Sequence, residues 1–179
     1  ELFSDPAAYA AEPAALEQLT SFVSCPRVCT LLTGLTRDGE SGAPRLKKAD
    51  YYHEQTTHDW DGDWHRDSQF GRTDPHVERE AIFTTASLHV RVALTADDRL
   101  EIVPGSHRRW DNDEELRIRK GAKRTDARMP DAARITLRAG DACVFHAWSI
   151  HRATYRQSPL RRTLDILYGF DRTCPNRTP

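Results

Sequence analysis

Two short segments carry residue types that bind transition metals. The first is His65-Arg66-Asp67, and the second is an apolar run that ends at His151. In a strand, residues two apart project to the same side with Cα atoms roughly 7 Å apart, so an imidazole and a carboxylate can converge on one ion. Two histidines and one carboxylate leave the remaining positions of the metal open, as in non-haem Fe(II) oxygenases. His65, Asp67 and His151 are therefore candidate ligands of an open, catalytic metal site.

Two histidines compete for the third ligand position. His146 and His151 both lie in the run 142–151, which we expect to form one strand. Because side chains alternate between the two faces of a strand, His151 would share a face with Cys143 and Phe145. His146 would point the other way unless a bulge intervened. His151, at the end of a face of small and apolar residues, is the better candidate.

A pair of arginines begins the next predicted strand. After His151 the chain turns at Ser158-Pro159 and continues through Arg161-Arg162 into a β-rich run, 163–170. We expect this turn to form a hairpin that brings an arginine near His151. The fixed fork of donors on a guanidinium suits bidentate capture of a carboxylate.

Charge, hydropathy and cysteine content exclude several classes of protein. The chain has 179 residues with 26 Lys+Arg against 27 Asp+Glu, so it lacks the basic excess of a nucleic-acid binder. No stretch approaches the 18 or so continuous apolar residues of a membrane span. The four cysteines have neither zinc-site spacing nor the density of a disulfide framework, which favours a reducing compartment. We expect a cytoplasmic protein whose partner is a small molecule, with no nucleic acid and no membrane.

The elements that must position these residues are mostly strands. Residues 6–23 favour one or two short helices, with Pro13 starting or breaking a helix instead of lying inside one. Asn112 and Glu115 resemble a capping box that opens a short surface helix, and Asp97-Asp98 resembles a turn. Such a pattern favours an antiparallel sandwich or barrel. The runs with strand character are 27–33, 45–53, 81–95, 100–103, 133–138, 142–151 and 163–170.

Four segments together resemble the phytanoyl-CoA dioxygenase family in order and approximate spacing, over about residues 45–172. The resemblance implies a mainly β fold, a double-stranded β-helix or jelly roll with short flanking helices. The length of 179 residues fits a single domain over 1–179, with the catalytic core at 45–172 that the resemblance covers and a helical addition at 1–25. The four segments are Trp64-His65-Arg66-Asp67, the run Leu100-Glu101-Ile102-Val103-Pro104-Gly105-Ser106-His107, the run from Gly140-Asp141 to His151, and Arg162.

The resemblance also implies roles for single residues. His65, Asp67 and His151 would bind Fe(II), and Arg162 would pair with the distal carboxylate of 2-oxoglutarate, with Arg161 as the nearby alternative. The remaining candidates are assigned away from the metal: His107 to a loop near the site, and His89 to the structure of a strand. Ala153 stands where relatives often carry a small hydroxyl residue that helps to hold 2-oxoglutarate.

The reaction implied by the resemblance is an oxidation by O2. The protein would be an Fe(II)- and 2-oxoglutarate-dependent dioxygenase that hydroxylates a C–H bond of a small molecule and releases succinate and CO2. Halogenation is disfavoured, because halogenases of this fold replace the carboxylate ligand and Asp67 is present. Desaturation, epoxidation and cyclisation would use the same ligands and stay open. A different alternative is a non-catalytic jelly-roll module that binds a small ligand or a structural metal.

Overall fold

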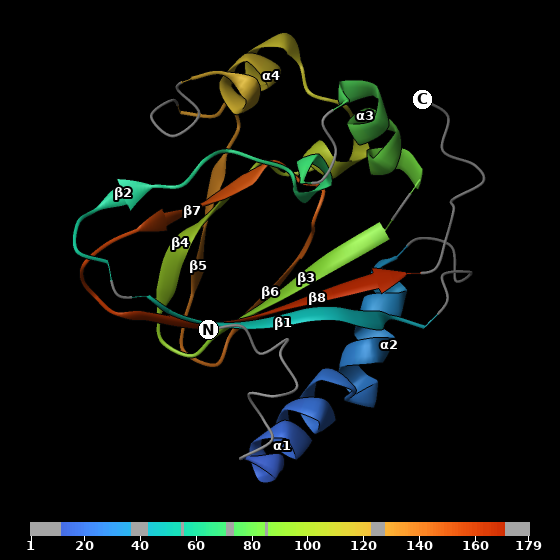
Figure 1. Cartoon of the computed structure of the whole chain (residues 1–179), viewed down its shortest axis with the longest axis vertical. Coiled ribbons are helices and arrows are strands. Elements are labelled where there is room, and N and C mark those ends of the chain that lie inside the picture. Colours follow the sequence, from blue (N-terminus) through green and yellow to red (C-terminus); the bar gives the residue numbers. More distant parts are fainter. Residues whose placement is uncertain are drawn as a thin grey trace.

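Two antiparallel four-stranded sheets face each other in the computed structural model, which describes residues 12–36, 43–54, 56–70, 74–84, 86–122 and 128–170 (Figure 1). The strands are β1 (Arg45–Glu54), β2 (Trp60–Asp61), β3 (Ala86–Ala93), β4 (Asp97–Ile102), β5 (Ala133–Leu137), β6 (Ala142–His146), β7 (His151–Tyr155) and β8 (Arg161–Phe170). One sheet has the order β1-β8-β3-β6 and the other the order β2-β7-β4-β5. The predicted mainly β jelly roll with short flanking helices is confirmed.

Four α-helices flank the two sheets in the described part of the chain. They are α1 (Pro13–Val23), α2 (Pro26–Leu35), α3 (Pro75–Thr84) and α4 (Asp113–Lys120), and two short 3-10 turns are η2 (Asp67–Gln69) and η3 (Ser106–Arg108). Figure 1 shows α1 and α2 beside the sheet that contains β1 and β8, and α3 and α4 at the opposite end of the molecule. None of the described helices is long and apolar enough to cross a membrane.

Alternation along β3 and β8 gives their sheet one apolar and one polar face. Leu88, Val90, Ile166 and Tyr168 join a buried cluster with Leu32 of α2, so the outer face of the sheet is covered by helices. Side chains on the opposite face of the same two strands line a cavity. Among them are His89, Arg91, Arg161 and Asp165. Side chains on a strand alternate between faces, so this polar face is built into the same strands that supply the core.

The N-terminal helical prediction is confirmed where the structure describes it, because α1 begins at Pro13. Three predicted features lie outside the described residues: residues 6–11 of that helical segment, the end of the predicted core at 171–172, and Cys174. The strand expected at 27–33 is wrong, since this run lies within α2. Its β-branched residues suggested a strand, but Pro26 starts a helix and the i, i+4 pair Val28 and Leu32 packs onto the sheet.

Other element boundaries also differ from the prediction. Residues 81–84 end α3, so only the later part of the run 81–95 is a strand, and Asp97-Asp98 begins β4 instead of forming a turn. The run 142–151 is interrupted, because β6 ends at His146 and β7 begins at His151 in the other sheet. The expected hairpin after β7 is wrong for the same reason: β7 and β8 belong to different sheets, and the chain crosses between them.

Candidate metal centre

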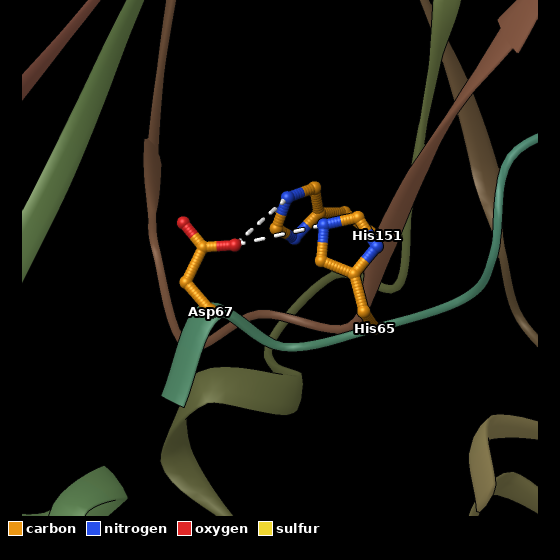
Figure 2. Close-up of side chains that lie close together, drawn as sticks. All are labelled: His65, Asp67 and His151. Carbon is orange, nitrogen blue, oxygen red and sulfur yellow. Dashed lines mark ion pairs between the residues drawn. The ribbon is translucent and has the colours of Figure 1, made fainter. Parts of the chain in front are cut away.

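Backbone pairing brings the two ligand segments together. His65 and His151 form an antiparallel bridge, in which each backbone N–H donates to the other residue's carbonyl oxygen at 3.0 and 2.9 Å. Asp67 follows at the start of η2, and its carboxylate turns back toward both imidazoles (Figure 2). Nε2 of His65 lies 3.6 Å and Nε2 of His151 lies 3.7 Å from Oδ1 of Asp67. The three candidate ligand atoms all lie within 4.8 Å of one another.

The other ring nitrogens of the two histidines are held by backbone carbonyls. Nδ1 of His65 lies 2.7 Å from the carbonyl oxygen of Asp63, and Nδ1 of His151 lies 2.9 Å from that of Ser149. A carbonyl oxygen can only accept, so each Nδ1 carries a proton, and in the neutral form of each ring Nε2 keeps the lone pair that binds a metal. Burial, assisted by the neighbouring His65, lowers the pKa of His151 to about 3, so this imidazole is neutral near pH 7. Both rings are therefore ready to bind a metal.

A third histidine holds the second oxygen of Asp67. Nε2 of His89, on β3, lies 2.6 Å from Oδ2, which leaves Oδ1 directed at His65 and His151. Burial alone would raise the pKa of Asp67, but the hydrogen bond from His89 and the nearby imidazoles lower it to about 2. The carboxylate is thus ionised and oriented. Sequence reasoning assigned His89 only to a strand, because no local motif marks a residue that acts through a carboxylate 22 positions earlier.

Arg66, between the two candidate ligands, points away from them into the protein. Its side chain is fully buried and donates from Nε to Oδ1 of Asp111 at 2.8 Å. Nη1 donates to the carbonyl oxygens of Ser106 at 2.8 Å and of Trp148 at 2.5 Å. One guanidinium therefore ties the His65–Asp67 segment to the loop at Ser106 and to the turn that precedes His151.

The charge cluster around Arg66 extends into α4 and α3. Asp111 also accepts from Nε of Arg119 at 2.8 Å, and Arg119 pairs with Glu78 of α3 at 2.7 Å. The capping box predicted at Asn112 and Glu115 is present, but the expectation that α4 only decorates the surface is wrong. Ile118 and Arg119 are buried, and Arg119 anchors this helix to the charge cluster around Arg66.

The three candidate ligands open into a cavity of about 680 Å³ between the sheets. Arg161 is 3% exposed and lines this cavity, with its guanidinium 5.5 Å from the ring centre of Tyr155. Arg162 is exposed and does not line the cavity. Of the two predicted candidates, this placement favours Arg161 over Arg162. The further lining residues are Lys48, Asp50, Tyr52, Trp60, Gly62, Asp63, Phe70, His89, Arg91, Leu100, Phe145, Trp148, Ala153, Tyr155, Asp165 and Leu167.

Of the other residues singled out in the sequence, Ala153 lines this cavity, whereas His107 and His146 do not. The ring of His107 stacks on that of His146 with centroids 5.2 Å apart, and neither belongs to the group of facing ligands. Ala153 lies on the cavity wall two residues after His151 on β7, as expected from the strand period.

The jelly roll and the three facing side chains define a double-stranded β-helix with a candidate metal site that is open to a cavity. The family model for phytanoyl-CoA dioxygenase (PhyH) matches residues 8–164. The chain therefore belongs to this family, and the resemblance of its motifs is confirmed. A comparison with curated proteins gives no match.

Several solved structures share the fold. SnoN, a non-haem α-ketoglutarate-dependent epimerase from nogalamycin biosynthesis, has a TM-score of 0.57 and 21% identity, over 85% of this chain and 56% of SnoN. SnoK, a carbocyclase from the same biosynthesis, has a TM-score of 0.58 and 19% identity, over 84% of this chain and 58% of SnoK. EvdO2 from Micromonospora carbonacea var. aurantiaca has a TM-score of 0.57 and 18% identity, over 91% of this chain and 68% of EvdO2. The chain thus spans little more than half the length of SnoN and SnoK.

Proposed function

We propose that the chain is an Fe(II)- and 2-oxoglutarate-dependent oxygenase that acts on a small molecule. The observation that carries this proposal is the group of two imidazoles and one carboxylate whose ligand atoms face one another at the wall of a cavity. Membership of the phytanoyl-CoA dioxygenase family supports it. So do the structures of SnoN with Fe3+ and α-ketoglutarate and of EvdO2 with 2-oxoglutarate, which have the same fold.

The donor set of the centre fits iron. Nε2 of His65, Nε2 of the neutral His151 and Oδ1 of the ionised Asp67 supply three ligands on one side, and the other positions stay open to the cavity. Carbonyl oxygens and His89 hold these donors in place, as outer partners do in metal sites generally. When bound, iron with 2-oxoglutarate supplies the oxidation by O2 that protein side chains cannot perform.

Arg161 is the residue we propose for the distal carboxylate of 2-oxoglutarate. Its guanidinium lies in the same cavity as the candidate ligands, and the ring of Tyr155 lies beneath it. A planar fork of donors pairs well with a carboxylate, especially where water is largely excluded. The exposed Arg162 lacks both conditions.

The reaction we propose at this site is hydroxylation of a C–H bond. Asp67 occupies the carboxylate position, so the centre has no vacancy of the kind that admits a halide. SnoN is an epimerase and SnoK a carbocyclase, which shows that this fold serves several oxidative outcomes. Incorporation of one atom from labelled O2 into the product would support hydroxylation, whereas an isomerised or cyclised product without that atom would contradict it.

An anaerobic titration tests the oxygenase proposal. Adding Fe(II) and 2-oxoglutarate to the purified chain should give a metal-to-ligand charge-transfer absorption, and admitting O2 should release succinate. His151→Ala should abolish the absorption, whereas His58→Ala, which alters an exposed histidine outside the cavity, should leave it unchanged. Absence of both absorption and succinate with the intact chain would contradict the proposal and favour a non-catalytic ligand-binding module.

A further inference from the structure

A row of three charged side chains crosses the inner face of one sheet. Asp165 on β8 pairs in register with Asp50 on β1 and with Arg91 on β3, so the three residues stand side by side. Each is less than 10% exposed, and all three line the cavity that holds the candidate metal centre. Asp50 and Arg91 belong to the two strands that flank β8, which places their Cα atoms roughly 10 Å apart.

The central pair of this row satisfies itself. Arg91 donates from Nε to Oδ1 of Asp165 at 2.8 Å and from Nη2 to Oδ2 at 2.6 Å. This bidentate geometry uses both carboxylate oxygens of Asp165. It leaves Nη1 of Arg91, which is buried, without a hydrogen-bond partner among the described residues.

Asp50 is satisfied on only one side. Its Oδ2 lies 2.6 Å from Nζ of Lys48, whose side chain is 44% exposed and reaches in from the edge of the cavity. Its Oδ1 is buried and has no hydrogen-bond partner within the part of the chain that the structure describes. A buried carboxylate oxygen without a donor is unfavourable, so a ligand group that donates to it would recover free energy on binding.

The row is distinct from the metal centre but within reach of it. Arg91 lies two residues beyond His89 on β3, about 7 Å further along the same face, and His89 holds Asp67. Arg161, the proposed anchor of 2-oxoglutarate, lies four residues before Asp165 on β8, roughly 13 Å away on the same face. Asp50 and the candidate ligands line the same cavity, so a small molecule that spans this cavity can contact both.

We propose that Asp50 selects the substrate by accepting a hydrogen bond from a hydroxyl or ammonium group on it. The inference rests on the proposed oxygenase function and assigns a substrate class to it. The substrate is a polar small molecule. One end carries a donor group that contacts Asp50, and the carbon that reacts lies at the other end, near the metal. Nη1 of Arg91, in the same row, is placed to donate to an oxygen of such a molecule. A purely apolar acyl chain would leave both groups unsatisfied.

Three six-membered-ring probes test this inference. Cyclohexylamine offers an ammonium group, cyclohexanol offers a hydroxyl, and cyclohexanone offers only an acceptor. Binding is measured by saturation-transfer NMR with the chain loaded with Zn(II), which is redox-inert, and 2-oxoglutarate. The measurement is repeated with the metal-free chain, so that it does not depend on iron chemistry. The two donor probes should bind the wild-type chain.

Two substitutions at Asp50 separate the two donor chemistries. Asp50→Leu should weaken binding of cyclohexylamine and cyclohexanol at least tenfold. Asp50→Asn should weaken cyclohexylamine by a similar factor but cyclohexanol only a fewfold, because an amide oxygen still accepts a hydrogen bond but carries no charge. Cyclohexanone should bind equally to all forms. Asp113→Asn, an exposed acidic residue at the start of α4, is the matched control and should change nothing.

The outcomes also separate this inference from the proposed function. The role of Asp50 would be overturned if its substitution weakened cyclohexanone binding as much as it weakened binding of the donor probes. It would also be overturned if both variants bound the donor probes as tightly as the wild-type chain does. Either result counts even if the charge-transfer absorption is present. Donor-selective binding through Asp50 without that absorption would support the subsite and contradict the oxygenase. Thermal unfolding of each variant checks that it is folded at the temperature of the binding measurement.

Discussion

The imidazole of His89 holds the oxygen of Asp67 that does not face the other two candidate ligands. Replacing it by phenylalanine keeps an aromatic ring against Phe145, on which His89 stacks, but removes the hydrogen bond. We expect His89→Phe to weaken Fe(II) binding about 10- to 100-fold, as loss of an outer partner of a metal ligand commonly does. His89→Gln should recover part of the affinity. Competition with a chromogenic chelator measures the Fe(II) affinity. If His89→Phe bound Fe(II) as tightly as the wild-type chain, Asp67 would not need the hydrogen bond from His89.

The two neighbouring arginines of β8 provide a matched pair of substitutions. Arg161 lies in the cavity, whereas Arg162 is exposed. We expect Arg161→Ala to raise the concentration of 2-oxoglutarate needed for half-maximal charge-transfer absorption at least tenfold, because the distal carboxylate loses a charge-assisted pair. Arg162→Ala should leave this concentration unchanged. The opposite result would return the assignment to Arg162.

Burial of His151 makes the stability of the metal-free chain depend on pH. Its folded-state pKa is lowered to about 3, whereas an unfolded histidine titrates near 6.5. Between these values the unfolded chain binds the extra proton, so the free energy of unfolding should fall as the pH drops from about 6.5 toward 3. The slope from this residue is about 1 kcal/mol per pH unit. Urea unfolding at pH 7, 6 and 5 should show the fall, and His151→Gln should remove this contribution.

Asp67 acts in a lower and separate pH window. Its pKa of about 2 lies below the unfolded value of about 3.9, so it stabilises the folded chain above pH 4. This contribution is lost as the pH falls from about 4 to 2. The Asp67 contribution is constant between pH 7 and 5. If His151→Gln still lost stability in that range, the loss would therefore come from groups other than His151 and Asp67.

At the scale of elements, Arg66 connects three segments that are far apart in the sequence. Its buried guanidinium bonds to Asp111 before α4, to the carbonyl of Ser106 and to the carbonyl of Trp148. Arg66→Met should destabilise the chain by about 3–5 kcal/mol, because it leaves buried acceptors and part of a buried charge unpaired. Arg117→Met on the exposed side of α4 should change stability by about 0.5 kcal/mol or less. Denaturant unfolding compares the two, and similar small effects would contradict the anchoring role.

Elements with local signals were predictable from the sequence. The capping box of α4 depends only on Asn112 and Glu115, and Pro13 marks the start of α1 through its own backbone restriction. The helix over 27–33 was not predicted, because the β-branched residues of this run suit a strand. The start signal at Pro26 and the packing of Val28 and Leu32 on the sheet outweigh that preference. Intrinsic propensities are smaller than the free energy of burying such a face.

The prediction for His151 agrees with its placement although the reasoning behind it does not. Alternation along one strand, 142–151, favoured His151 over His146, but the structure ends β6 at His146 and starts β7 at His151. His151 reaches the centre because its backbone pairs with His65 across the second sheet. Pairing between distant segments leaves no local signal, so residue type could nominate His151 but alternation could not justify it.

At the scale of the whole molecule, the cavity between the two sheets brings together groups from both of them. His151 and Tyr155 come from one sheet, and His89, Asp50 and Arg161 come from the other. The outer face of the sheet β1-β8-β3-β6 is apolar and is covered by α1 and α2, so its inner face can be polar. The fold thus keeps a core and a charged cavity on opposite faces of the same strands.

The sequence by itself determined the residue types of the centre, the family and the mainly β fold, because His65-Arg66-Asp67, His151 and the strand runs are local patterns. Only the tertiary structure decided which arginine enters the cavity, what His89 and Arg66 hold, and that Asp50 is left with an unpaired oxygen. The physical reason is the two-residue period of a strand: a shift of one position turns a side chain from the cavity to solvent. The register that fixes this position is set by pairing between strands far apart in the chain.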